Sequence, residues 1–247
     1  NWTSKGTNIS QGTTNLTSIE LSDDGTAIIV GEDFTASVFK YGTDWEQQNL
    51  SISGDSNTEE FGHAVSISGD GGVFAVGAPS IATSGVSGYV SIYVNNKNSV
   101  LSFGNEIYGY GDYDRLGSSV SVSADGNTIA MGANGSFNDN GTIRFGHVRV
   151  FEKTPNGLEQ IGSDIRNTTD FNSGSFGSVV ELSADGQHLA ISAPLLFTSA
   201  YGAVYVYERI GNSWNPLGNI IYGTYGSRTG SSLAFSDDGS ILAVGSG

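Results

Sequence analysis

The sequence contains no cysteine, only four prolines and only ten lysine and arginine residues among its 247 positions. Without thiolates the chain can form neither disulfides nor a zinc or iron–sulfur site built on cysteine. The basic residues are outnumbered by 25 acidic ones, giving a formal net charge of -15, so the clustered cations that bind phosphates are missing. No apolar run approaches the roughly 18 residues of a membrane span. We therefore expect neither a nucleic-acid partner nor insertion into a membrane.

Glycine, by contrast, is abundant. The chain has 36 glycines and only 14% charged residues, a composition that suits many short strands joined by tight turns. All-β chains of this length often form one domain, so we expect a single domain over residues 1–247. Because the first residue is Asn1, we also expect a processed chain or a piece of a longer one.

A Ser-x-Asp-Gly tetrad, or a close variant, followed by a short apolar strand recurs five times. An alternating stretch precedes the tetrads, such as FGHAVSIS from Phe61, and predicts a strand with one buried face. The Asp-Gly pair then turns the chain, because glycine takes the positive φ that a tight hairpin needs. Each tetrad therefore predicts a β-hairpin. The tetrad glycines are Gly25, Gly71, Gly126, Gly186 and Gly239.

The repeating unit has four predicted strands, and the units begin near residues 16, 61, 116, 176 and 229. Residues 1–15 resemble the fourth strand, whereas the fifth unit stops after its second strand. We predict a β-propeller of about five four-stranded blades, with one blade incomplete or closed by both termini. A solenoid is the competing repeat fold, but its units are generally shorter. The missing strand leaves three alternatives: a three-stranded closing blade, a strand donated by another chain, or a longer propeller.

The units resemble FG-GAP repeats, the blade motif of integrin α chains and of many extracellular proteins. The first unit, with Leu16-Thr17 and Gly31-Glu32, matches least well. The resemblance implies a propeller at the cell surface or outside the cell, with a role in adhesion. The matching residues are Phe61-Gly62 with Gly77-Ala78-Pro79, Leu116-Gly117 with Gly132-Ala133, Phe176-Gly177 with Ser192-Ala193-Pro194, and Thr229-Gly230 with Gly245.

Many FG-GAP blades carry a calcium loop between their first two strands, and here the short tetrad hairpin stands in its place. Calcium needs six to eight oxygen ligands, so we look for it in two other segments. One contains Asn138, Asp139 and Asn140, and the other contains Asp112 and Asp114. The same residue types are typical of surface turns, so a turn without metal is the alternative.

Two acidic residues stand at equivalent places in the first strands of their units. Glu20 and Glu181 each lie five residues before their tetrad glycine. Five-bladed propellers can be glycosidases, which need two carboxylates facing the substrate. Alternation places Ser66, Ser121 and Ala234 on the same face, which equally suits a contact with the next blade. A glycosidase is therefore an alternative function, and it predicts that Glu20 and Glu181 share a pocket.

The three histidines give no catalytic pattern. His63, His147 and His188 fall at different positions of their units, so no recurring role is predicted for them. Without cysteine, a serine nucleophile would need a poised histidine and an acid, and no such trio is visible in the sequence.

Two loops between units share tyrosine and arginine. Each connects a fourth strand to the next first strand, so we expect both on the same rim. Tyrosine and arginine are typical of binding hot spots, and sugars stack on such rings. Tyrosines packed between blades are the alternative. The residues are Tyr108, Tyr110, Tyr113 and Arg115 in one loop, and Tyr222, Tyr225 and Arg228 in the other.

The sequence favours an extracellular or cell-surface propeller without catalysis, which binds a protein or a carbohydrate through rim loops. A self-assembling structural module of a larger surface protein and a glycoside hydrolase are the alternatives. Glycosylation motifs of the form N-x-[ST] are compatible with secretion. They begin at Asn1, Asn8, Asn15, Asn49, Asn134, Asn140 and Asn167.

Overall fold

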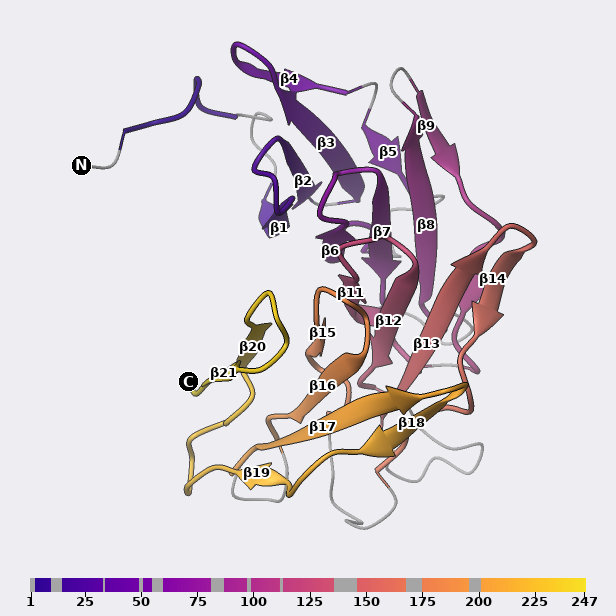
Figure 1. Cartoon of the computed structure of the whole chain (residues 1–247), viewed down its shortest axis with the longest axis vertical. Helices are drawn as coiled ribbons and strands as arrows, with labels where there is room; N and C mark the ends of the chain where they lie inside the picture. The colour runs from indigo at the N-terminus through magenta and orange to yellow at the C-terminus, as the bar shows by residue number, and fades with distance from the viewer. Residues whose placement is uncertain are drawn as a thin grey trace.

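The predicted all-β repeat is confirmed by the computed structural model of the chain. It describes residues 3–9, 15–32, 34–48, 51–54, 60–80, 87–96, 99–111, 113–135, 146–167, 175–195 and 201–247. In these ranges every regular element is a β-strand, and the strands pair antiparallel in five sheets (Figure 1). Within the same ranges, no helix is long and apolar enough to cross a membrane.

The five sheets follow one another along the chain. The first holds β1 (Leu16–Leu21), β2 (Ala27–Glu32), β3 (Thr35–Tyr41), β4 (Trp45–Gln47) and β5 (Ile52–Ser53). The second holds β6 (Ala64–Ile67), β7 (Val73–Ala78), β8 (Tyr89–Asn96), β9 (Ser99–Ser102) and β10 (Ile107–Tyr108). The third holds β11 (Leu116–Val122), β12 (Thr128–Ala133), β13 (His147–Thr154) and β14 (Gly157–Gln160). The fourth holds β15 (Val180–Leu182), β16 (His188–Ala193), β17 (Ala203–Ile210), β18 (Ser213–Pro216) and β19 (Ile221–Tyr222), and the fifth β20 (Ser232–Phe235) and β21 (Leu242–Gly245).

The predicted fourth strand is split into two short pieces. In the first, second and fourth sheets both pieces pair with the same third strand: β4 and β5 with β3, β9 and β10 with β8, and β18 and β19 with β17. In the third sheet the second piece is a single bridge between Val148 and Ile165. The chain therefore leaves the sheet edge between the two pieces and returns to it.

All five tetrads form the same turn. In each, the serine hydroxyl donates to the aspartate Oδ1 at 2.6–2.8 Å, and the glycine N–H donates to the serine carbonyl oxygen at 2.8–2.9 Å. The glycines have φ between 65° and 69°, which side chains with a Cβ rarely adopt. The Ser236 hydroxyl, with the N–H of Ser240, lowers the pKa of Asp238 to about 2. The aspartates are thus held inside the turns by hydrogen bonds.

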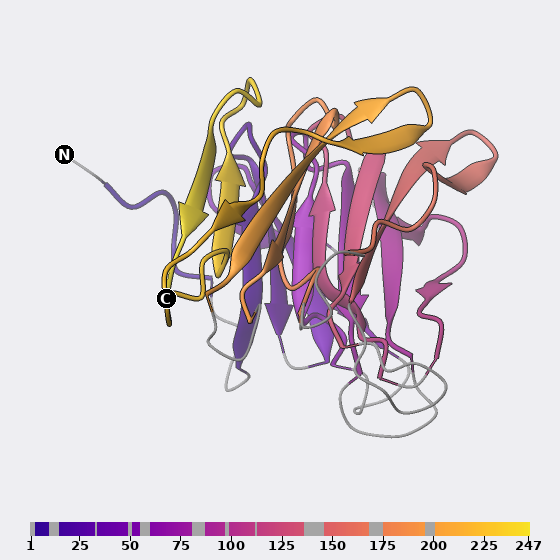
Figure 2. The same ribbon diagram turned by 90° about the horizontal axis from the view of Figure 1, so that it is seen from below.

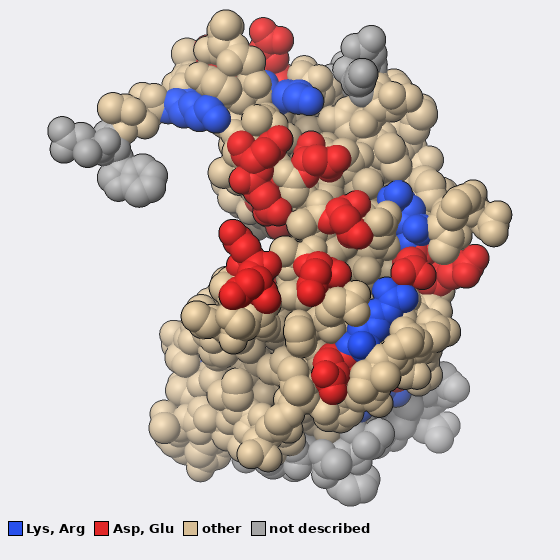
Figure 3. Space-filling view, in the orientation of Figure 1, with Lys and Arg blue, Asp and Glu red and all other residues tan. Residues whose placement is uncertain are grey.

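The sheets stand side by side in an arc (Figures 1 and 2). The first strands β1, β6, β11, β15 and β20 lie along its inner side, and the short outer strands lie at its outer side. The arc is open between the first and fifth sheets. Acidic side chains gather over the inner part of the face in Figure 3. Apolar cores fill the boundaries between the first and second, second and third, and third and fourth sheets.

A recurring hydrogen bond ties each first strand to the next one. Side-chain oxygens of Glu20, Ser66 and Ser121 accept the backbone N–H groups of Ile67, Val122 and Leu182 at 2.9, 2.9 and 3.0 Å, and Glu181 accepts that of Phe235. These acceptors occupy the same position in successive units. We call this series the inter-sheet ladder.

The paired motif glycines also have an inter-sheet role. A Cβ at Gly31, Gly77 or Gly132 would lie 2.1–2.2 Å from the carbonyl oxygen of Gly62, Gly117 or Gly177, respectively, in the following unit. Real atoms do not approach so closely. The glycines of the repeat therefore let the backbones of adjacent sheets touch.

Residues 3–9 bind the first sheet. The Trp45 indole N–H donates to the Lys5 carbonyl oxygen at 2.8 Å, and Asp44 accepts the Thr7 N–H at 2.7 Å. Gly104, which follows β9 of the second sheet, lies against Leu158 of the third sheet, and Gly6 lies against Trp45 of the first sheet in the same way. Residues 3–9 therefore stand beside the first sheet as an outer strand of a preceding sheet would, in keeping with their predicted resemblance to a fourth strand. Among the described residues this segment does not pair with β20 or β21, and the fifth sheet has these two strands there.

Candidate functional site

Glu20 and Glu181 line the same small hollow at the inner side of the arc, as predicted. The hollow has a volume of about 100 Å³, and Asp23, Ser121 and Asp237 also line it. Burial raises the pKa of Glu20 to about 7. Burial and the charge of Glu20 together raise the pKa of Glu181 to about 7. Both carboxyls are therefore poised to exchange protons near neutral pH.

The geometry of these two carboxyls favours a structural role. Each is an acceptor of the inter-sheet ladder, in the place that serine takes in the second and third units. A hollow of about 100 Å³ is well below the roughly 300–1,000 Å³ of ordinary ligand sites. The two carboxyls thus share a pocket, as the glycosidase hypothesis predicts, but this pocket is smaller than ordinary ligand sites.

The first tyrosine loop is engaged with its own sheets. The Tyr110 hydroxyl donates to Asp164 Oδ1 at 3.1 Å, and its ring packs on His147 and on the Arg149 guanidinium, each about 5 Å from the ring centre. The Tyr108 hydroxyl binds Glu106. These contacts match the packing alternative for this loop, although Tyr108, Tyr110 and Tyr113 keep exposed surface.

The second tyrosine loop is more open. Tyr222 and Tyr225 are 53% and 77% exposed, and in the described chain their hydroxyls have no hydrogen-bond partner. Tyr201, which the sequence interpretation missed, packs edge-on against Tyr225 with ring centres 5.9 Å apart. Arg228 is exposed beside them. We call Tyr201, Tyr222, Tyr225 and Arg228 the tyrosine patch.

The two loops are equivalent but form separate surfaces. Each begins with a short outer strand at the start of a third strand, β10 on β8 and β19 on β17. Arg115 and Arg228 both have positive φ, 59° and 44°, just before the motif pair. However, the third sheet lies between them, and no hydrogen bond, ion pair or ring contact joins them within the described ranges.

The calcium segments fall largely outside the described residues, which do not include Asp112, Asn138, Asp139 or Asn140. Asp114 is only 1% exposed, accepts the Tyr110 N–H at 3.0 Å and faces His147 Nδ1 at 3.6 Å. Among the described residues no cluster of three metal-ligating side chains occurs. Calcium therefore stays a prediction, and Asp114 has a structural partner.

His63 lies near Glu60 at 3.8 Å, and His188 packs on Phe235.

The glycosylation motifs differ in accessibility. Asn8 and Asn15 are exposed, and Asn134 is half-buried. Asn167 is only 6% exposed, and its Nδ2 donates to the Tyr205 hydroxyl at 2.6 Å. Glycosylation at Asn167 stays a prediction, and it would require this atom to leave its hydrogen bond with Tyr205. Asn1, Asn49 and Asn140 lie outside the described residues.

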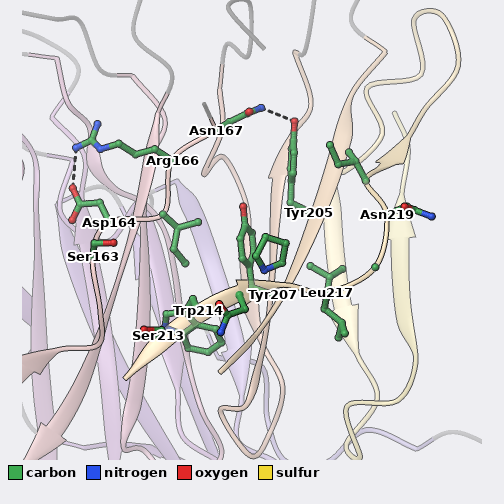
Figure 4. Close-up of a pocket in the computed structure, with 16 residues that line it drawn as sticks. Ser163, Asp164, Arg166, Asn167, Tyr205, Tyr207, Ser213, Trp214, Leu217 and Asn219 are labelled. Atoms are coloured by element: carbon green, nitrogen blue, oxygen red, sulfur yellow. Dashed lines mark hydrogen bonds and ion pairs between the residues drawn. The ribbon is translucent and has the colours of Figure 1, made fainter. Parts of the chain in front are cut away.

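A larger cavity, which no sequence motif predicts, opens between the third and fourth sheets. It has a volume of about 510 Å³. Tyr205 and Tyr207 of β17 and Trp214 of β18 line one side, and the segment with Asp164, Arg166 and Asn167 lines another (Figure 4). Its walls come from residues about 40 positions apart, which explains why spacing alone gives no signal.

Comparison with known proteins supports the fold alone. No protein-family model and no curated protein matches the chain. Among solved structures, Kuenenia stuttgartiensis hydrazine synthase is similar with a TM-score of 0.63 and 17% identity, over 98% of this chain and 58% of that one. A functionally unknown protein from Desulfotomaculum acetoxidans is similar with a TM-score of 0.62 and 17% identity, over 94% of this chain and 63% of that one. The chain thus spans about three-fifths of each of these two structures.

Proposed function

We propose that the five sheets are blades of a β-propeller of the FG-GAP kind, in which further sheets complete the ring. The arc of sheets with first strands innermost supports this (Figure 1). So do the inter-sheet ladder and the greater length of the similar structures.

The face of the first sheet that points away from the second sheet, which we call its flank, also supports a preceding sheet. Ile19 and Leu21 are 57% and 52% exposed, whereas Val120 and Val122, at the equivalent places of the third sheet, are 9% and 8% exposed because the second sheet covers them. A preceding sheet would bury this flank.

As its function, we propose non-catalytic binding of a protein or glycan at the cell surface or outside the cell. The observation that carries it is the tyrosine patch, with Tyr222 and Tyr225 exposed and their hydroxyls unpartnered among the described residues. Tyrosine offers a large, rigid contact area at low entropic cost, and arginine adds a planar donor.

Substitution of both open tyrosines tests this function. Tyr222→Ser with Tyr225→Ser should weaken binding of a partner found by pull-down or glycan array at least about tenfold, as expected for hot-spot residues. The matched control is Tyr108→Ser, which removes the equivalent tyrosine of the first loop. Pull-downs and arrays that both stay blank, or a purely cytosolic protein, would contradict the proposal.

A self-assembling module is the second candidate, favoured by the exposed apolar flank of the first sheet. If copies of the chain join through this flank, light scattering after gel filtration should show oligomers that Ile19→Lys reduces to monomers. A strict monomer at high concentration would dismiss this function.

A further inference from the structure

Two donors in the wall of the cavity between the third and fourth sheets have no hydrogen-bond partner in the described chain. Tyr207 is only 8% exposed, and its hydroxyl lacks a partner. The Trp214 indole N–H is buried and likewise unpaired. Because Tyr207 lines the cavity and its hydroxyl has no partner among the described residues, this hydroxyl can donate to an occupant that supplies an acceptor oxygen.

The first sheet gives a precedent for the tryptophan. Trp45 pairs with Tyr41 in the hairpin of β3 and β4, as Trp214 pairs with Arg209 in the hairpin of β17 and β18. The Trp45 indole N–H donates to the Lys5 carbonyl oxygen at 2.8 Å. The Trp214 indole N–H has no such acceptor among the described residues.

The cavity favours a neutral polar ligand. Asp164 and Arg166 are the only charged residues in its described lining, and they pair with each other at 2.8 Å. Most of the remaining polar lining consists of side-chain amides and hydroxyls, which donate and accept as sugar hydroxyls do. The amide and hydroxyl residues are Asn167, Asn215, Asn219, Ser163 and Ser213.

An apolar surface faces these polar groups. Trp214 and Leu217 stand beside Tyr207 (Figure 4), and Trp214 is half-buried, so part of its ring is open to a ligand. A volume of about 510 Å³ lies within the range of small-molecule sites. A ligand with an apolar face and oxygen-rich edges fits such walls.

We propose that this cavity binds a neutral sugar residue, stacked on the Trp214 ring, with one of its oxygens accepting a hydrogen bond from the Tyr207 hydroxyl. The site goes beyond the proposed function, because none of Tyr201, Tyr222 and Tyr225 lines the cavity. Burial raises the pKa of Tyr207 to about 12, so its hydroxyl keeps its proton at neutral pH and remains a donor.

Titration with neutral methyl glycosides tests the proposal. The methyl glycosides of glucose, galactose, mannose and N-acetylglucosamine are added to the full chain and followed by saturation-transfer NMR and tryptophan fluorescence. At least one should bind, and Tyr207→Phe should weaken it roughly 3- to 10-fold, the usual effect of one lost hydrogen bond. Trp214→Leu should abolish the fluorescence change, although Trp2 and Trp45 remain.

Both substitutions copy residues that the fold already accommodates. Phe151 stands at the place of Tyr207 in the third sheet, and Leu158 stands at the place of Trp214. Tyr93→Phe, the matching change in the second sheet, should leave glycoside affinity unchanged. Tyr222→Ser with Tyr225→Ser should also leave it unchanged, which separates this site from the tyrosine patch.

Three results would overturn the proposal. One is that none of the four glycosides binds. Another is that one binds equally well to the wild type, to Tyr207→Phe and to Trp214→Leu. The third is that neutral peptides, but no glycosides, change the Trp214 signal, which would assign the cavity to a peptide instead.

Discussion

The two central boundaries between sheets and the two boundaries at the ends of the arc form the same inter-sheet hydrogen bond. The accepting side chain is serine at the central boundaries and glutamate at the end boundaries. Between the second and third and the third and fourth sheets, the ladder acceptors are Ser66 and Ser121, which are 2% and 5% exposed. Between the first and second and the fourth and fifth sheets, they are Glu20 and Glu181, whose pKa values burial raises to about 7. The same position of the repeat thus carries an acceptor that titrates near neutral pH at two boundaries and an acceptor that does not at the other two.

The largest expected effect comes from a substitution that prevents the close backbone contact between the third and fourth sheets. In Gly132→Ala, the new Cβ would lie 2.1 Å from the Gly177 carbonyl oxygen, so the third and fourth sheets must separate. We expect a loss of about 3 kcal/mol or more in the free energy of unfolding, measured by denaturant titration.

Gly111→Ala is the matched control, because nothing lies within 4 Å of a Cβ at that residue. Its unfolding free energy should change by no more than roughly 0.5 kcal/mol. Equal effects of the two substitutions would show that the sheet contact is not what requires glycine.

The second effect is a dependence of stability on pH, which we expect from the two boundaries whose acceptors are Glu20 and Glu181. Between pH 4.5 and 7 the folded chain holds protons on Glu20 and Glu181 that the unfolded chain has released. The free energy of unfolding should therefore fall as pH rises through this window, by up to about 3 kcal/mol for each carboxyl.

The double substitution Glu20→Gln with Glu181→Gln keeps an acceptor oxygen at both places and should flatten this fall. Thermal unfolding measured at intervals from pH 4.5 to 8 checks it. A variant with the same slope as the wild type would mean that these carboxyls ionise normally in the folded chain.

A smaller effect is expected at the boundary between the third and fourth sheets, where the acceptor is Ser121. Ser121→Ala leaves the Leu182 N–H without its acceptor, which should cost about 1–2 kcal/mol. The loss should be equal at every pH from 4.5 to 8, since a hydroxyl does not titrate there. A loss that grows with pH would show that Ser121 is coupled to the nearby carboxyls.

The features that sequence predicts well here are local. The tetrad turns follow from serine, aspartate and glycine a few positions apart, and the same hydrogen bonds form in all five. The shared position of Glu20 and Glu181 in the repeat correctly predicted a common hollow. Repetition is informative because equivalent residues take equivalent places.

The features that sequence does not predict depend on which side chains meet across sheets. Tyr110 and Tyr225 stand in similar loops, yet Tyr110 binds Asp164 of the next sheet, and Tyr225 remains exposed. The cavity arises because Trp214 and Tyr207 meet the segment with Asp164 across a boundary. Neither contact leaves a periodic trace in the sequence.

The inter-sheet ladder gives the arc a direction. Each unit offers an oxygen to the N–H of the unit that follows, and the series stops at Ala234, whose methyl group cannot accept. The two flanks are therefore unlike. A sheet added before the first could extend the ladder by presenting serine or glutamate to Leu21, whereas a sheet added after the fifth meets a methyl group. Two copies joined head to tail would be held at this position by apolar contact alone.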